Sequence, residues 1–207
     1  MALYAQIEPS MKKIGQQKAS LAALICIVIV LSIYVHFAKY TSWESSFFRS
    51  FYDMPLAWKS IMLIITTSGS IWMVILVVTV LFIKQKTKLA LFVTVLALAT
   101  FGITELLKIL VARPRPYIAL NSVVSRDIMA AGMGYPSGHT AIVTMTGLSL
   151  SFLLPKNIRW VVFVWIGLVG VSRMYLGVHA PLDIVGGILL GTIVFLIAKI
   201  TRPKYFA

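Results

Sequence analysis

The chain has 207 residues, 59% of them hydrophobic, and its mean hydropathy is +0.93, whereas soluble globular domains contain roughly 45 to 50% apolar residues. Lys and Arg outnumber Asp and Glu by 19 to 6, which gives a net charge of +13. These basic residues form short clusters at the ends of apolar runs rather than one patch with interleaved aromatics. The pattern excludes a soluble nucleic-acid-binding protein and predicts a protein of the lipid bilayer whose basic clusters meet the headgroups.

Six apolar stretches come close to the ~20 residues that a helix needs to cross the hydrocarbon. In chain order they are residues 19–38, 60–83, 88–109, 138–154, 159–178 and 182–200. The fourth is short, and the second contains a polar run from Thr66 to Ser70, which a bundle tolerates if neighbouring helices satisfy the hydroxyls. The sequence therefore predicts an all-α fold: a single domain over residues 1–207, built as a bundle of six transmembrane helices.

Basic residues mark every second connection between these stretches. They are Lys12, Lys13 and Lys18 before the first, Lys84, Lys86 and Lys88 after the second, Lys156 and Arg159 after the fourth, and Lys199, Arg202 and Lys204 at the end. By the positive-inside rule, these connections and both termini are expected to be cytoplasmic in the cell membrane. Segments 39–59 and 110–137 and the turn near residue 179 are then expected outside, with the aromatic-rich 39–59 as a helix or loop at headgroup depth.

His179 and Asp183 are four residues apart at the start of the sixth stretch, a spacing that places two side chains on one face of a helix. A carboxylate there can accept a hydrogen bond from one ring nitrogen and leave the lone pair of the other free to attack an electrophile. An ordinary polar pair, with Asp183 favoured by the helix dipole, explains the spacing equally well. The pair alone leaves both interpretations open.

The segment Tyr135-Pro136-Ser137-Gly138-His139 directly precedes the fourth stretch. Pro and a small hydroxyl residue at a helix start leave backbone N–H groups free to bind an anion such as phosphate. His139, on the first helical turn, could then donate a proton to a leaving oxygen. A plain N-cap followed by an exposed histidine is the alternative interpretation.

Four basic side chains lie at the outward ends of the third and fifth stretches. They are Lys108, Arg113, Arg115 and Arg173. A phosphoryl group in transfer spreads negative charge over its oxygens, and fixed cations at a poorly hydrated interface stabilise that charge. Most basic residues at helix ends instead bind lipid headgroups or snorkel to the interface, and we assign Arg113 and Arg126 to this second group.

Three motifs follow one another in the chain. In the first, six residues separate Lys108 from Arg115-Pro116. The second is Pro136-Ser137-Gly138-His139. In the third, five residues separate Ser172-Arg173 from His179, and three more separate His179 from Asp183. Together they resemble the type 2 phosphatidate phosphatase superfamily, and the six-span pattern is similar to its membrane lipid phosphatase branch, which includes phosphatidylglycerophosphatase B-like and undecaprenyl-diphosphatase-like enzymes. The resemblance covers residues 108–183 by motif and the rest of the chain by span count only.

The resemblance implies a metal-independent and cofactor-free phosphatase that acts on a membrane lipid phosphate or diphosphate at the extracytoplasmic end of the bundle. It implies that His179 attacks phosphorus, that His139 protonates the leaving group and then activates water, and that Asp183 orients His179. The residues implied to hold the phosphoryl oxygens are Lys108, Arg115, Arg173, Ser137 and the backbone at Gly138. Candidate substrates are undecaprenyl diphosphate, phosphatidylglycerol phosphate and phosphatidate, and the motifs do not choose among them.

Two other hypotheses remain. The first treats His139, His179 and Asp183 as a two-histidine, one-carboxylate metal site of a metal-dependent hydrolase. The neighbouring cations argue against it, because they would repel a divalent ion. The second is a non-enzymatic lipid-binding or transport bundle, which predicts polar residues deep within several spans rather than at one end.

Two smaller features predict local contacts. Gly187 and Gly191 form a Gly-x-x-x-Gly pattern in the sixth stretch, which is typical of close helix packing. Glu105 lies three residues before Lys108, a spacing that favours an ion pair on one helix face.

Overall fold

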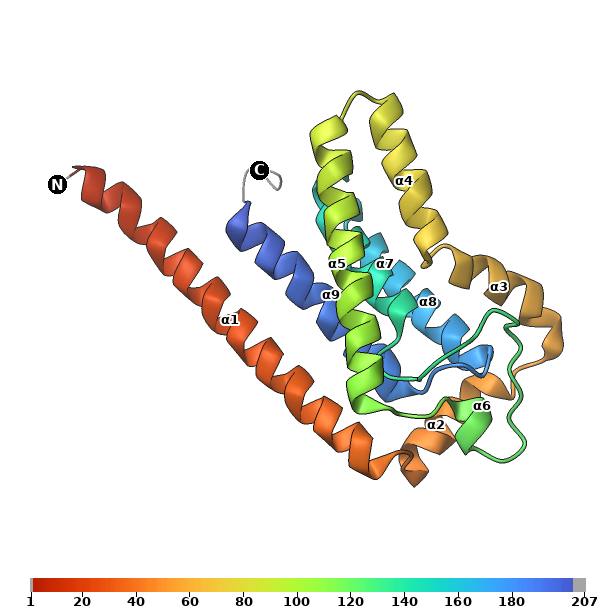
Figure 1. Cartoon of the computed structure of the whole chain (residues 1–207). Coiled ribbons are helices and arrows are strands. Elements are labelled where there is room, and N and C mark those ends of the chain that lie inside the picture. The colour runs from red at the N-terminus through yellow and green to blue at the C-terminus, as the bar shows by residue number, and fades with distance from the viewer. Residues whose placement is uncertain (1, 203–207) are drawn as a thin grey trace.

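The computed structural model in Figure 1 describes the backbone of residues 2–202 and the side chains of residues 14–202. Its helices are α1 (Ala2–Ala38), α2 (Ser42–Tyr52), η1 (Leu56–Trp58), α3 (Lys59–Thr67), α4 (Ile71–Ile83), α5 (Thr87–Val111), α6 (Pro116–Ala119), α7 (Gly138–Leu150), η2 (Ser151–Leu153), η3 (Lys156–Ile158), α8 (Val161–Tyr175) and α9 (Pro181–Thr201). Residues 2–202 contain no β-strand, which confirms the all-α prediction. The basic residues Lys12, Lys13 and Lys204, which enter the predicted orientation, lie outside the described side chains.

Four segments within residues 2–202 are long and apolar enough to cross a membrane, and they are Ile14–Ala38, Thr87–Ala119, Lys156–Tyr175 and Pro181–Thr201. A fifth is present if α3 and α4, which meet at a bend of 48°, are counted as one broken span. The chain is thus a multi-pass membrane protein. The predicted count of six spans is not confirmed, because α7 has only 13 residues, a length of about 20 Å at a rise of 1.5 Å per residue.

Helix α7 is the centre of the bundle, as Figure 1 shows. It packs against α5, α8 and α9, while α1 packs on α9 and α4 pairs with α5. The bundle therefore surrounds the first turn of α7 with the C-terminal ends of α5 and α8 and the N-terminal end of α9, the helix ends from which the predicted site residues come.

The polar run in the second predicted span forms the bend between α3 and α4. Gly69 packs directly on α8, where a Cβ atom would lie 2.6 Å from a methyl group of Val169. Ser68 Oγ accepts a hydrogen bond from Trp165 Nε1 of α8 at 2.8 Å, and Thr66 Oγ1 accepts one from Arg173 Nη1 at 2.9 Å. Both of these hydroxyls therefore find partners on a neighbouring helix, which is the condition the sequence sets for such a run.

The Gly-x-x-x-Gly pattern brings α9 against α7, as predicted. A Cβ atom on Gly191 would lie 2.5 Å from the carbonyl oxygen of Ala141, and one on Gly187 would lie 3.1 Å from the backbone nitrogen of the same residue. Neither position has space for a side chain. The backbones therefore touch directly, and the start of α7 is held beside the start of α9.

The aromatic-rich segment 39–59 forms α2 and η1 and packs on the bundle. Glu44, Phe48 and Tyr52 are the buried residues of α2, and the helix contacts α8 and α9. Its exposed face includes Trp43, which is 54% exposed. This segment is therefore a short helix with one face in the protein core, rather than one lying wholly among lipid headgroups.

Candidate active site

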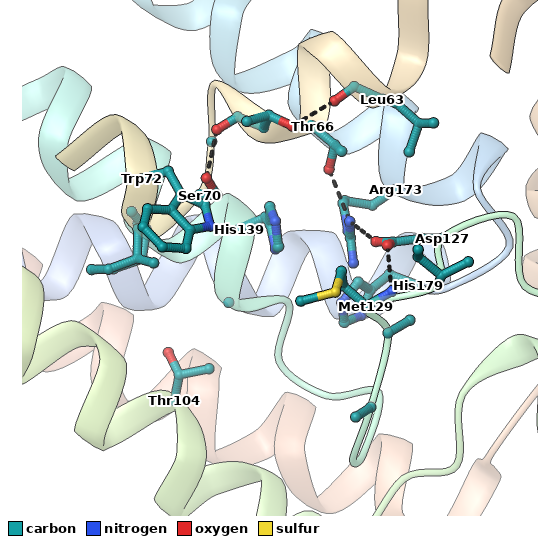
Figure 2. Close-up of a pocket in the computed structure, with 18 of the residues that line it drawn as sticks. Leu63, Thr66, Ser70, Trp72, Thr104, Asp127, Met129, His139, Arg173 and His179 are labelled. Carbon is teal, nitrogen blue, oxygen red and sulfur yellow. Dashed lines mark hydrogen bonds and ion pairs between the residues drawn. The ribbon is translucent and has the colours of Figure 1, made fainter. Parts of the chain in front are cut away.

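A cavity of about 660 Å³ lies between the C-terminal halves of α3, α5 and α8 and the first turn of α7 (Figure 2). Six of the predicted site residues line it although they come from distant parts of the sequence, namely Lys108, Arg115, Gly138, His139, Arg173 and His179. The other two, Ser137 and Asp183, are fully buried behind the cavity wall. The structure thus brings all the predicted residues to one end of the bundle.

The cavity also has an apolar part, which lies at the bend between α3 and α4. Ile71, Trp72 and Phe101 contribute to its lining. Figure 2 shows Trp72 on one side of His139, and Arg173 and His179 on the other. Charged and apolar binding surface therefore share one space, which suits an amphiphilic ligand.

The ring of His179 is held in one tautomer by the backbone. Its Nδ1 lies 2.7 Å from the carbonyl oxygen of Gly134, and because a carbonyl only accepts hydrogen bonds, Nδ1 must carry the hydrogen. Nε2 then carries the lone pair, which accepts a long hydrogen bond from Arg115 Nη1 at 3.4 Å that an incoming phosphoryl group can displace. The arrangement is that of an uncharged imidazole ready to act as a nucleophile.

Asp183 lies beside this ring but is not its nearest acceptor. Its Oδ2 is 3.6 Å from His179 Nδ1 and accepts a hydrogen bond from the backbone N–H of Ala180 at 2.8 Å. The sequence spacing allows the carboxylate to accept the ring hydrogen directly, whereas the Gly134 carbonyl takes that position in the structure. The four-residue spacing does bring the two side chains together, with the Gly134 carbonyl as the nearer acceptor for Nδ1.

Burial lowers the pKa of His179 well below its ordinary value, and the nearby charges of Arg115, Arg173 and Lys108 lower it further. The hydrogen bond to Gly134 acts in the opposite direction but is the smaller effect. The imidazole is therefore neutral in the resting site, which a nucleophilic nitrogen requires.

Each of the two cavity arginines predicted to bind phosphate is held in place by protein groups. Arg115 donates from Nε to the carbonyl of Gly132 at 3.0 Å and from Nη2 to that of Ala131 at 2.5 Å. Arg173 Nη1 donates to Asp127 Oδ2 at 2.8 Å as well as to Thr66 (Figure 2). Both guanidinium groups are therefore oriented before any ligand arrives.

Lys108 and the start of α7 form another wall of the cavity. Lys108 Nζ pairs with Glu105 Oε1 at 2.7 Å, which confirms the predicted local ion pair. A Cβ atom on Gly138 would lie 4.0 Å from that Nζ, so the first turn of α7 faces the lysine. Ser137 caps this turn, its Oγ accepting from Thr140 N at 3.5 Å. Ser137 is 0% exposed, and Gly138 is the part of the predicted anion site that lines the cavity.

His139 lies on the first turn of α7 and lines the cavity. Within residues 14–202 its ring makes no hydrogen bond to another protein group, in contrast to that of His179. It is therefore able to exchange a proton with a bound ligand or with water.

Arg113 does not lie among lipid headgroups, so the assignment made from the sequence is wrong. It is 1% exposed, and its guanidinium donates to Asp183 Oδ1 at 2.7 Å and to Glu44 Oε2 at 2.5 Å. The reason is that the chain after α5 turns across the end of the bundle, where α2 and α9 supply two carboxylates.

Arg126 is likewise bound by protein groups rather than by lipid. Its guanidinium lies between the rings of Tyr52 and Tyr175, at 4.1 and 4.6 Å from their centroids, and donates to the carbonyl of Tyr175 at 3.0 Å. It fixes the loop before α7 onto α2 and α8.

Four residues near the site are not identified by the sequence motifs. They are Glu44, Thr66, Asp127 and Gly134. Glu44 carries one weak signal, since it is one of only six acidic residues and lies beside an aromatic run. The contribution of Gly134 comes from its backbone carbonyl, which no side-chain pattern can reveal.

Within the part of the chain that the structure describes, no group of three or more His, Cys, Asp or Glu side chains is arranged to hold a metal ion. Both Asp183 oxygens already accept hydrogen bonds, one from Arg113 and one from Ala180. The metal-site hypothesis for His139, His179 and Asp183 is therefore not supported by the geometry.

Comparisons with known proteins agree with these motifs. The model of the PAP2 superfamily matches residues 87–206. The undecaprenyl-diphosphatase of Sulfolobus acidocaldarius is 27% identical over 174 residues, which are 82% of this chain and 84% of that protein. Phosphatidylglycerophosphatase B of Bacillus subtilis is 30% identical over 118 residues, which are 50% of this chain and 55% of that protein.

A solved structure shares the fold. The crystal structure of the transmembrane PAP2 type phosphatidylglycerolphosphate phosphatase from Bacillus subtilis aligns with a TM-score of 0.74 at 22% identity, covering 89% of this chain and 96% of that one. The family model covers more than half of the sequence and includes all eight predicted site residues, from Lys108 to Asp183. This chain is a phosphatase and belongs to the PAP2 superfamily.

Proposed function

We propose that this protein hydrolyses a membrane lipid phosphate or diphosphate through a covalent phosphohistidine at His179. The observation that carries the proposal is the hydrogen bond from His179 Nδ1 to Gly134, which leaves the Nε2 lone pair for a cavity lined by Lys108, Arg115 and Arg173. A neutral nitrogen nucleophile beside three fixed cations is suited to an electrophile that carries negative charge.

In the first half of the reaction, the Nε2 lone pair of His179 forms a bond to phosphorus while the bond from phosphorus to the leaving oxygen breaks. The electron pair of the broken bond stays on that oxygen, which takes a proton from His139. The dephosphorylated lipid, or the lipid monophosphate when the substrate is a diphosphate, leaves in protonated form. The His179 ring now carries the phosphoryl group on Nε2, a hydrogen on Nδ1 and a positive charge.

In the second half, a water molecule attacks phosphorus and gives a proton to His139, which restores the general acid. The bond between phosphorus and Nε2 breaks, and its electron pair returns to the nitrogen. The products are inorganic phosphate and the neutral His179 ring. Lys108, Arg115 and Arg173 hold the three non-bridging oxygens throughout, and they supply the charge neutralisation that divalent metals provide in other phosphoryl-transfer sites.

The lipid character of the substrate is supported by the apolar part of the cavity. Trp72 and Phe101 lie at its lining and are 68% and 53% exposed, so a hydrocarbon chain could lie against them while its phosphate reaches His179. The similar proteins are named for undecaprenyl diphosphate and for phosphatidylglycerophosphate. We propose these two lipids and phosphatidate as the substrates to test.

We further propose that the cavity opens outside the cytoplasm and that both termini are cytoplasmic. In Figure 1 the connection between α4 and α5, which carries Lys84 and Lys86, lies at the opposite end of the bundle from α2 and α6. The positive-inside rule places such a short basic connection on the cytoplasmic side.

The test uses purified protein in detergent, assayed for phosphate release from each of the three lipids. His179→Ala should lose at least about 1,000-fold in kcat on the best substrate, whereas His36→Ala, which changes the one histidine remote from the cavity, should stay near wild type. Wild-type protein quenched during turnover should carry phosphate in an acid-labile, base-stable form, and His179→Ala should not. Turnover by His179→Ala at the wild-type rate would contradict the assigned nucleophile.

A chelator separates this proposal from a metal-dependent one. EDTA should leave the activity unchanged, because protein cations hold the phosphoryl group. A strong loss that added Zn²⁺ or Mg²⁺ restores would count against the phosphohistidine route.

A further inference from the structure

Three ionised side chains from three separate elements form a buried chain behind His179. Arg113, in the connection after α5, lies between Glu44 of α2 and Asp183 of α9, with N···O distances of 2.5 Å and 2.7 Å. Glu44 and Arg113 are each 1% exposed, and Asp183 is 0% exposed. Removing such charges from water is costly, so an arrangement of this kind has to be held by further hydrogen bonds.

Every oxygen and every nitrogen of the three side chains has a partner. Glu44 Oε1 accepts from the backbone N–H of Leu182 at 3.1 Å, and Asp183 Oδ2 accepts from that of Ala180. Arg113 Nε donates to the carbonyl of Lys39 at 2.9 Å, and Nη2 donates to the same oxygen. Glu44 therefore connects α2 to the N-terminal turn of α9, which follows His179 directly. One connection is its hydrogen bond from the backbone of Leu182, and the other runs through Arg113 to Asp183.

Arg113 reaches His179 by two routes. Its guanidinium binds Asp183, whose other oxygen lies 3.6 Å from His179 Nδ1. Its carbonyl accepts a hydrogen bond from the backbone N–H of Gly134 at 2.7 Å, and the carbonyl of Gly134 accepts the hydrogen of His179 Nδ1 at 2.7 Å. The same residue thus positions both acceptors that face Nδ1.

The net charge of these three residues sets the electrostatic potential at the His179 ring during the reaction. The phosphorylated ring is positive and lies among three cations, so it needs a negative charge nearby. Asp183 supplies one, but a single ion pair with Arg113 would be neutral and would cancel it. Glu44 adds a second negative charge on the far side of Arg113, and the three residues together keep a net charge of −1.

We propose that Glu44 is a positioning residue for phosphoryl transfer: by sharing the charge of Arg113, it keeps the Asp183 carboxylate effective beside the His179 ring and holds the Gly134 carbonyl in place. This inference rests on the proposed function, with His179 as the nucleophile. Glu44 itself lies outside the cavity and touches no substrate, so its removal should affect the rate of the chemical steps rather than the binding of the phosphoryl group.

The experiment compares Glu44→Gln, Glu44→Asp and a matched control, Asp53→Asn, which removes one exposed carboxylate at the end of the same helix. Gln keeps the size of Glu but removes its charge, whereas Asp keeps the charge in a shorter side chain. Glu44→Gln should lower kcat for lipid phosphate hydrolysis on the order of 10- to 100-fold, the range observed when a partner behind a functional ligand is removed. KM and the inhibition constant of inorganic phosphate, which occupies the phosphoryl site without bonding to His179, should change little, and Glu44→Asp should retain more activity than Glu44→Gln.

Turnover is counted per orthovanadate-binding site, so that misfolded protein does not enter kcat. A purely structural role predicts the reverse order, with the isosteric Gln more active than Asp, and a parallel loss of kcat and of affinity for inorganic phosphate; either result would overturn the proposal. So would a Glu44→Gln preparation without any orthovanadate-binding protein, because Glu44 would then be required for folding rather than for catalysis. A wild-type kcat in Glu44→Gln, together with an inactive His179→Ala, would refute this inference alone, whereas an active His179→Ala would refute the proposed function.

Discussion

The direct contact between α7 and α9 makes the spacing of the two histidines sensitive to one methyl group. A Cβ atom on Gly191 would lie 2.5 Å from the carbonyl oxygen of Ala141, and ordinary contact begins at 3.4 Å, so Gly191→Ala must separate the helices by about 0.9 Å. The obstructing atom belongs to the backbone of α7, which cannot rotate away as a side chain can. Ala141 is in the same helical turn as His139, and the displacement therefore reaches the site.

A displacement of about 1 Å costs on the order of 100-fold in rate when it separates reacting groups, and overpacking a core costs about 1 to 3 kcal/mol of stability. We expect Gly191→Ala to lower kcat on the order of 10- to 100-fold in the detergent assay of phosphate release. Its thermal unfolding should also begin at a lower temperature than that of the wild type, because the helices are forced apart.

The control is Gly167→Ala in α8, where a Cβ atom would meet no heavy atom within 4 Å. This variant should keep both its kcat and its unfolding temperature. If Gly191→Ala released phosphate at the wild-type rate, the contact between α7 and α9 could not be what sets the distance between His139 and His179.

Two further predictions concern the charges in the cavity. Burial and the nearby charges of Arg115, Arg173 and Lys108 lower the pKa of His179, and the Gly134 hydrogen bond opposes them. Asp183 and His139 also face the ring. Because only the unprotonated ring attacks, kcat/KM should fall with decreasing pH only below the ordinary histidine pKa of about 6.5. Arg115→Gln removes one cation and should move this acid limb to higher pH, and an unmoved limb would contradict the assignment. Thr66→Val removes an acceptor of Arg173 and should weaken orthovanadate inhibition about tenfold, since hydrogen bonds to charged groups contribute about 1.5 to 3 kcal/mol. The exposed Thr79→Val of α4 is its control, and equal inhibition constants in the two variants would show that Thr66 does not orient the arginine.

Much of the charged site follows from local spacing. A helix places residues three or four apart on one face, so Glu105 and Lys108 lie side by side in α5. Gly187 and Gly191 predict a close helix contact for the same reason. His179 lies two residues before α9 begins, and its short distance in the sequence from Asp183 still brings the two side chains together.

The contacts that the sequence does not predict depend on segments that pack from elsewhere. Arg113 resembles any basic residue at a helix end until α2 brings Glu44 to it. The Gly134 carbonyl is a backbone group on an irregular loop, and it takes the acceptor position that the spacing makes possible for Asp183. A sequence motif identifies side chains, whereas the tautomer of His179 is determined by a backbone carbonyl, which any residue could supply.

Helix length shows the same limit. The apolar run 138–154 suggests a membrane span, yet α7 ends at Leu150 and continues as the short helix η2. Its apolar side chains are buried against neighbouring helices rather than facing lipid, and hydropathy does not distinguish the two environments. The single-domain assignment of residues 1–207 and the outward orientation stay predictions.

The carboxylate partners of the cavity cations have a consequence for the end of the catalytic cycle. Asp127 lies 2.8 Å from Arg173, and Glu105 lies 2.7 Å from Lys108. Two of the three cations proposed to hold the phosphoryl group are therefore partly neutralised before a ligand binds. A free phosphate ion competes with these carboxylates, whereas a phospholipid gains additional affinity from its hydrocarbon chain. The site can therefore discriminate between its substrate and its product, and inorganic phosphate can dissociate from a cluster of cations that would otherwise retain it.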